Sequence, residues 1–251
     1  MADTLVLCYH ALSDTWPADL SVAPGPFEEQ LEELLGRGYR GVTFTEAVTG
    51  RDGAPRLSVT FDDAYRSVIE LAFPILSRLG LPATVYVPAD FVGVDGPMSW
   101  PGIDCWLDGP HEEEMRCLDP AELKTLAGAG WEIGSHTRSH PHLPALPPDS
   151  LEEELKGSRE RLEDALGLPC RSIAYPYGDV NRRVVRAAER AGYEAAGTLR
   201  AWELRRNPLL WPRVGVYRGD SLERFKLKVS PLARRLRLSG IRHPINAARR
   251  K

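Results

Sequence analysis

The sequence predicts an α/β fold, a single barrel of about seven parallel strands that is closed or nearly closed. Short apolar runs alternate with amphipathic helical segments, a pattern typical of parallel strands joined by helices. About seven such units fit into the 251 residues, an ordinary length for one barrel. The polar residues suited to chemistry follow directly after apolar runs, and strand C-terminal ends form the active face of such barrels.

The expected strands are short apolar runs bounded by glycine, proline or polar residues. In chain order they cover residues 5–9, 42–44, 57–61, 83–87, 131–134, 172–175, 195–198 and 214–216. The run at 57–61 leads straight into two aspartates, and the run at 131–134 leads into Ser135 and His136.

The expected helices carry apolar residues at helical spacing and end near glycine or proline. They cover residues 26–37, 65–78, 119–130, 149–166, 181–191 and 221–229. Asp119 and Pro120 suit the N-cap and the first turn of the third helix. The helix at 149–166 is charged, with its leucines spaced to face inward.

Composition indicates an ordinary globular protein, with 43% hydrophobic residues and a net charge of −3. No run of about 18 apolar residues would span a membrane. The N-terminus lacks the features of a secretory signal, so we expect a cytoplasmic location. The four cysteines form no C-x-x-C pair, and we expect free thiols, with a Cys105–Cys117 disulfide as the alternative.

Charge divides the chain into an expected catalytic domain, residues 1–224, and a basic C-terminal tail, residues 225–251. The tail has nine Lys or Arg and no acidic residue, which leaves −12 on the first 224 residues. The acidic body argues against a nucleic-acid partner. The tail has two interpretations, peripheral contact with an anionic membrane or a solvated segment.

The segment 95–117 has little periodicity and holds Trp100 and Trp106. A loop of this length in a compact domain is often functional. It would either wall a substrate groove, with tryptophans against sugar faces, or form a packed surface excursion.

Two motifs carry the predicted chemistry. His136 and His140 are four residues apart and can face one metal ion if the backbone turns helically, although this spacing alone is weak evidence. Asp62 and Asp63 end an apolar strand, where carboxylates are costly unless paired or metal-bound. Helix capping is the alternative for the aspartates.

Taken together, the motifs predict a catalytic metal site at the strand C-terminal face. Asp63, His136 and His140 would be three ligands with open positions left, as catalytic sites require. Zn²⁺ is the expected ion, and Co²⁺ or Ni²⁺ would suit the same ligands. Asp62 would accept a proton from the attacking water.

The chain resembles the polysaccharide deacetylases, carbohydrate esterase family four, through TFDD at 60–63, SHTRSH at 135–140 and AYPYG at 174–178. The resemblance covers roughly residues 4–217. It implies a distorted (β/α) barrel, Asp62 as general base, and Asp63, His136 and His140 as metal ligands. It also implies that the backbone N–H of Tyr177 contributes to an oxyanion hole.

The chain departs from the family pattern in two places. Ala174 stands where many members carry an arginine that braces the catalytic aspartate, and Arg213 is our candidate substitute. No C-terminal Leu-x-His donates a proton to the leaving group, so we assign the general acid to His10, as in the branch with a shuffled motif order. Its other interpretation is a hydrogen-bonded histidine at the barrel mouth. We expect His142 to support the metal loop.

These residues predict a metal-dependent hydrolase that removes acetyl groups from an N-acetylglucosamine-type glycan or sugar precursor. An O-acetyl esterase or a small-amide hydrolase would use the same site, because the metal sees only a carbonyl. A glycan-binding protein without catalysis is the third hypothesis.

Overall fold

Nine strands form one sheet of parallel neighbours in the computed structural model, which describes residues 3–50, 53–199 and 207–238. The sheet order is β10-β9-β8-β7-β6-β5-β1-β11, and β4 pairs with β5. The strands are β1 (Thr4–Tyr9), β4 (Arg40–Gly41), β5 (Arg56–Phe61), β6 (Ala83–Val87), β7 (Glu132–Ser135), β8 (Ser172–Ala174), β9 (Ala195–Thr198), β10 (Trp211–Pro212) and β11 (Val214–Gly215).

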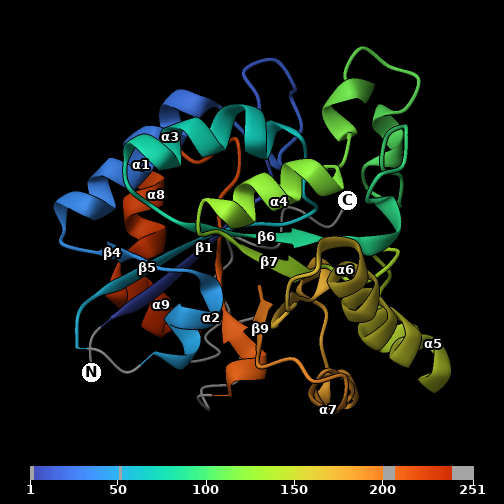
Figure 1. Cartoon of the computed structure of the whole chain (residues 1–251). Coiled ribbons are helices and arrows are strands. Elements are labelled where there is room, and N and C mark those ends of the chain that lie inside the picture. The colour runs from blue at the N-terminus through green and yellow to red at the C-terminus, as the bar shows by residue number, and fades with distance from the viewer. Residues whose placement is uncertain (1–2, 51–52, 200–206, 239–251) are drawn as a thin grey trace.

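The sheet nearly closes on itself. β10 and β11 lie at its two ends, and in the sequence they are separated by Arg213 alone. Together with the helices that surround the strands in Figure 1, this is the distorted (β/α) barrel that the sequence predicts. A separate small pair, β2 (Ala11–Leu12) and β3 (Ser21–Val22), follows β1.

The helices mostly follow strands, as expected of strand–helix units. They are α1 (Pro24–Gly36), α2 (Phe44–Thr49), α3 (Phe73–Arg78), α4 (Pro120–Gly128), α5 (Pro148–Glu152), α6 (Ser158–Leu166), α7 (Arg182–Arg190), α8 (Leu222–Val229) and α9 (Pro231–Leu238). Two π-helical turns extend these elements, η1 (Val68–Ala72) before α3 and η6 (Glu153–Gly157) between α5 and α6. Asp119 caps α4 as predicted, and Asn181 caps α7.

Two local predictions were wrong. Residues 42–44 are not a strand, because α2 begins at Phe44 and the carboxylate of Glu46 accepts the N–H of Thr43 at 2.9 Å. This capping interaction outweighs the β-like apolar run. The helix expected from residue 65 begins at Val68, because the backbone of Asp63 and Ala64 is left-handed, with φ of 68° and 54°.

The two faces of the strands differ in polarity. Side chains alternate along a strand. In β5, Leu57, Val59 and Phe61 belong to the main hydrophobic core, and the intervening Ser58 and Thr60 belong to the other face. Cys8 and Tyr86 occupy the same alternate positions of β1 and β6. The barrel interior is therefore partly polar.

The four cysteines are free thiols as predicted, and the disulfide alternative was wrong. In the described part of the chain, no helix is long and apolar enough to cross a bilayer. The predicted boundary at residue 225 stays a prediction; α8 runs across it and buries Phe225. Residues 239–251 of the basic tail lie outside the described part.

Candidate active site

The predicted chemical residues meet at one edge because the strands are in register. Tyr9 of β1 pairs with Phe61 of β5, and Phe61 pairs with Val85 of β6. β6 and β7 continue the register, with Val87 beside Ser135. The residues that follow β1, β5 and β7 therefore gather at the strand C-terminal edge, where barrel active sites are built.

Unusual backbone conformations concentrate at this edge. Six non-glycine residues of the described chain have positive φ, and all but Asp108 lie in the three predicted motifs or directly after one, namely Asp63, Ala64, Thr137, His140 and Tyr177. The left-handed region is uncommon for residues with a Cβ, and such strain persists only where the surroundings enforce it. The turns after β5, β7 and β8 are thus shaped to direct particular side chains.

Asp63, His136 and His140 form a compact, buried triad. The Oδ1 atom of Asp63 lies 3.3 Å from Nε2 of His136 and 3.4 Å from Nε2 of His140. The three side chains are 4%, 2% and 6% exposed. A tetrahedral ion with bonds of about 2.0–2.1 Å would separate its ligand atoms by about 3.3–3.4 Å. The donor atoms fit a zinc-like ion, and no hydrogen-bond donor in the described chain satisfies Asp63 Oδ1.

The imidazole rings present the correct nitrogen to the triad. Nδ1 of His136 donates to the carbonyl of Ala174 at 2.8 Å, which leaves the lone pair on Nε2 for a metal. Burial lowers the pKa of His140 to about 3, so its ring is neutral at pH 7. Burial also disfavours a charged His136, but the carboxylates of Asp62 and Asp63 outweigh it and raise the pKa of that ring.

Asp62 stands beside the triad and is held by Arg213. Nη1 of Arg213 donates to Oδ1 at 2.6 Å and Nη2 donates to Oδ2 at 2.7 Å. Burial alone would raise the pKa of Asp62, but the guanidinium outweighs it and holds the pKa well below the usual range. Asp62 is therefore ionised at neutral pH.

Arg213 needs space inside the barrel to reach this position. Its side chain is fully buried, and Nη1 also donates to the hydroxyl of Thr60 at 3.0 Å. A Cβ at Gly197 would lie 2.6 Å from Nε of Arg213, so β9 requires glycine there. The structure places Arg213 against Asp62. This is the contact that the sequence analysis expects of a substitute for the arginine missing at Ala174.

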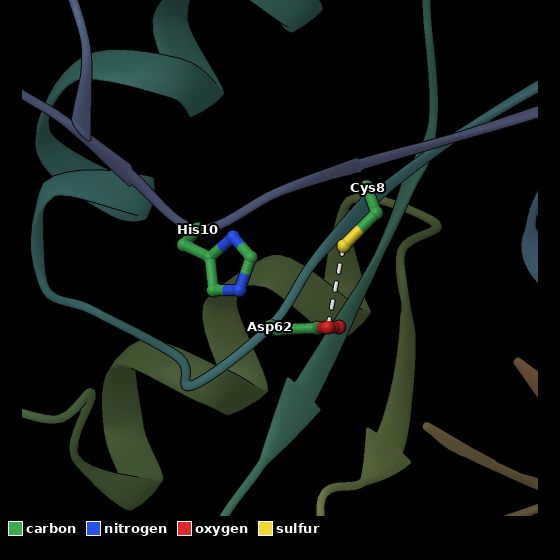
Figure 2. Close-up of side chains that lie close together, drawn as sticks. All are labelled: Cys8, His10 and Asp62. Carbon is green, nitrogen blue, oxygen red and sulfur yellow. Dashed lines mark hydrogen bonds between the residues drawn. The ribbon is translucent and has the colours of Figure 1, made fainter. Parts of the chain in front are cut away.

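Cys8 is a neighbour of Asp62 that the sequence analysis missed. Its buried thiol donates to Oδ2 of Asp62 at 3.2 Å (Figure 2). Alternation along β1 was the available signal, because residues 8 and 10 face the same side of a strand. An ionised carboxylate has about four lone-pair sites. Arg213 and Cys8 occupy two on Oδ2 and one on Oδ1, which leaves Oδ1 with a free site.

His10 is a further neighbour of Asp62 and lies close to Cys8. One potential ligand atom each from Cys8, His10 and Asp62 lies within 4.8 Å of the others, and Figure 2 shows the three side chains around a common space. Nδ1 of His10 is buried and has no hydrogen-bond partner among the described residues. The structure thus brings the predicted acid close to the predicted base.

Tyr177 lies in a short 3₁₀ turn, Pro176–Gly178, that follows β8. The residue is 38% exposed, and its ring contacts His140 edge-on at 4.6 Å between centroids. His142 was expected to support the metal loop. Instead its ring stacks on Tyr177 at 4.0 Å, and Nδ1 bonds to Asp179 at 2.8 Å, so it contacts the turn after β8.

The segment 95–117 packs onto the site rather than standing away from it. Trp100 is 7% exposed and stacks on His140 with centroids 4.3 Å apart. Trp106 packs edge-on against the buried Trp16. Trp100 therefore supports a triad histidine with its ring face and does not offer that face to a sugar.

The chain is similar to known proteins over most of its length. A family model described as polysaccharide deacetylase matches residues 49–196. YxkH of Bacillus subtilis is 27% identical over 198 residues, which are 77% of this chain and 63% of YxkH. The poly-beta-1,6-N-acetyl-D-glucosamine N-deacetylase of Staphylococcus epidermidis is 24% identical over 195 residues, 71% of this chain and 61% of that protein. The chain thus spans less than two thirds of the length of these relatives.

Solved structures agree with this match. A polysaccharide deacetylase from Bacillus cereus is 29% identical with a TM-score of 0.72, covering 90% of this chain and 68% of that chain. IcaB from Ammonifex degensii is 26% identical with a TM-score of 0.74, covering 92% and 98% respectively.

Proposed function

Because the chain belongs to the polysaccharide deacetylase family, we propose that it hydrolyses the N-acetyl amide of an N-acetylglucosamine-type sugar with the help of a divalent metal ion. One observation carries the proposal: Asp63 Oδ1 lies 3.3 and 3.4 Å from two imidazole nitrogens, while the neighbouring Asp62 is turned to Arg213. The Staphylococcus relative, named for an N-acetylglucosamine polymer, supports the substrate class.

Asp63, His136 and His140 would hold the ion, with Zn²⁺ favoured and Co²⁺ or Ni²⁺ compatible with the same ligands. When bound, such an ion lowers the pKa of water and polarises a carbonyl. The raised pKa of His136 means that a proton competes with the ion for this ring more strongly than it would for a free imidazole.

Asp62 would accept a proton from the attacking water. Its ionised state, maintained by Arg213, provides the acceptor, and Oδ1 provides the free lone pair. Arg213 and Cys8 fix the plane of the carboxylate, so Oδ1 is held in one direction. This arrangement suits general base catalysis, which needs the acceptor within hydrogen-bond reach of the water.

His10 and the backbone of Tyr177 would complete the reaction. His10 would donate a proton to the departing amine, since one of its ring nitrogens lies within 4.8 Å of a carboxylate oxygen of Asp62. The N–H of Tyr177 would donate to the oxyanion of the tetrahedral intermediate, where a fixed donor is most effective. The left-handed φ of 58° at Tyr177 determines the conformation of the turn that carries this N–H.

Acetate release from the purified chain tests the proposal. We expect release from N-acetylglucosamine oligomers or precursors, its loss after chelation, and its return with Zn²⁺. A parallel panel of O-acetylated glycans and small amides separates the alternative hydrolases, and glycan binding without hydrolysis would favour a non-catalytic protein.

Contact of the basic tail with anionic membrane is also a proposal. Three cations at its start are paired: Lys226 lies 3.3 Å from Glu223, and Lys228 and Arg234 contact Asp220 and Asp3. The proposed lipid contact therefore rests on the cations that follow, which are Arg235, Arg237, Arg242, Arg249, Arg250 and Lys251. Flotation with phosphatidylserine vesicles should be lost when residues 239–251 are deleted and Arg235 and Arg237 are replaced by glutamine. Equal flotation of this variant would exclude the contact.

A further inference from the structure

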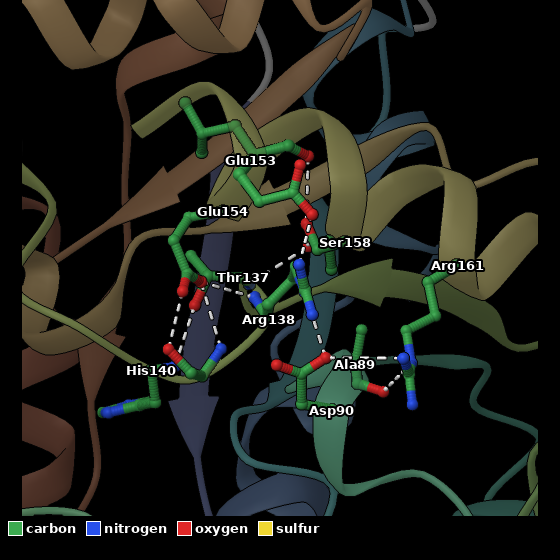
Figure 3. A network of polar contacts seen from close by, with 12 residues as sticks. Ala89, Asp90, Thr137, Arg138, His140, Glu153, Glu154, Ser158 and Arg161 are labelled. Carbon is green, nitrogen blue, oxygen red and sulfur yellow. Dashed lines mark hydrogen bonds and ion pairs between the residues drawn. The ribbon is translucent and has the colours of Figure 1, made fainter. Parts of the chain in front are cut away.

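Glu154 contacts the loop that joins the two proposed histidine ligands. Its Oε2 atom accepts the backbone N–H of Arg138 at 2.8 Å and that of Ser139 at 3.0 Å. Its Oε1 atom accepts the hydroxyl of Ser139 at 2.6 Å. Figure 3 shows this carboxylate against the turn between Thr137 and His140. One side chain thus satisfies three donors of the three-residue loop between His136 and His140.

The opposite edge of the loop is held by the segment after β6. The N–H of Ala89 donates to the carbonyl of Thr137 at 2.9 Å, and the N–H of Asp90 donates to the carbonyl of Arg138 at 3.0 Å. The guanidinium of Arg138 also donates to the carboxylate of Asp90 at 3.1 Å. The loop is therefore fixed between a helix and a strand end. On the helix side Glu154 binds its backbone, and Glu153 pairs with the guanidinium of Arg138.

The π-helical turn η6 explains how Glu154 reaches the loop. Glu154 lies within this turn, and the flanking Leu151 and Leu155 are buried in the hydrophobic core. π turns change the direction of side chains and are frequent at functional sites. Gly157 leaves room in the same turn, since a Cβ there would lie 2.8 Å from Oε1 of Glu153 and 3.3 Å from Cδ of Arg138.

We propose that Glu154 is a positioning residue for the metal site, and this rests on the metal binding in the proposed function. Thr137 and His140 have φ of 67° and 63°, which L residues rarely adopt without constraint. The three hydrogen bonds to Glu154 hold the turn in this conformation, and the turn directs both imidazoles toward Asp63. Glu154 acts through the histidines and does not touch the ion.

Zinc affinity of the metal-free protein, measured by competition with a chromophoric chelator, tests the proposal. We expect Glu154→Ala and the milder Glu154→Gln to weaken zinc binding by about 10- to 100-fold, which is the usual effect of mutating residues that orient metal ligands. The matched control is Glu152→Gln, an exposed glutamate of the same helix, which should bind zinc as the wild type does. Amide hydrogen exchange at Arg138 and Ser139 should be faster in both Glu154 variants.

The outcomes separate the positioning role from the wider proposal. Wild-type zinc affinity in folded Glu154→Ala or Glu154→Gln would overturn the role of Glu154, whatever their stability. Zinc binding by the wild type without acetate release would contradict the proposed function. The zinc affinities of the Glu154 variants and the wild type could still be compared in that case. Absence of zinc binding in the wild type would overturn both.

Discussion

Arg213 and Asp62 form a two-point contact across 151 residues of sequence, with N–O distances of 2.6 and 2.7 Å. Both side chains are buried, so the pair is shielded from water and salt. Removing one partner of a buried pair leaves an uncompensated charge, which costs far more than breaking an exposed pair.

We therefore expect Arg213→Met to lower the free energy of unfolding by about 3–5 kcal/mol and to abolish most acetate release. Urea unfolding of the metal-free protein measures the first effect. Arg171 and Glu194 provide the control, because they also form a two-point contact, at 2.8 Å from Nε and from Nη2, but on the surface. Arg171→Met should cost less than about 1 kcal/mol, and equal costs would contradict the argument.

Asp62→Asn should reduce acetate release by about 10²- to 10⁴-fold, because the amide is a very weak proton acceptor. Zinc affinity should change little, since Asp62 lies outside the triad. Parallel assays of acetate and zinc binding check this. A large loss of zinc from Asp62→Asn would mean that Asp62 is itself a ligand.

His136→Ala should weaken zinc binding by more than about 100-fold. This exceeds the usual effect of mutating a residue that only orients the ligands. Elemental analysis of the purified variant and chelator competition measure this. His142→Ala is the control, since His142 is exposed and contacts Tyr177 and Asp179 instead. If both variants kept their zinc, the triad would not be the metal site.

Cys8→Ala should lower the rate of acetate release by about 2- to 10-fold, the value of one modest hydrogen bond. Cys8→Ser should recover most of the rate, because a hydroxyl can also donate to Oδ2 of Asp62. The turnover number should change more than KM, since Asp62 acts in the chemical step. A serine variant as slow as the alanine variant would show that the donor is unimportant.

Zinc affinity should rise with pH through the titration of His136. Burial disfavours its charge, but the two carboxylates outweigh it and raise the pKa above 6.5, so the metal-free ring keeps a proton to higher pH. Zinc must displace that proton, so binding weakens as pH falls. Chelator competition across neutral pH measures this dependence, and a zinc affinity that does not change with pH would contradict the raised pKa of His136.

Much of the site follows from local sequence. The two aspartates end an apolar run, the two histidines are four residues apart, and parallel strands bring such ends to one edge. The N-cap of α4 was predictable because Asp119 acts on its own neighbours. The family motifs added roles that spacing alone does not provide, and those roles remain proposals.

Tertiary structure decided the partners of these residues. Arg213 reaches Asp62 because it lies at the seam where β10 and β11 close the sheet, and Gly197 leaves it room. Cys8, Trp100 and Glu154 come from separate segments with no motif in common. Local patterns report which way a side chain points along its own element. Contacts between distant segments depend on strand order, closure and the space left by neighbours, and only the folded barrel specifies these.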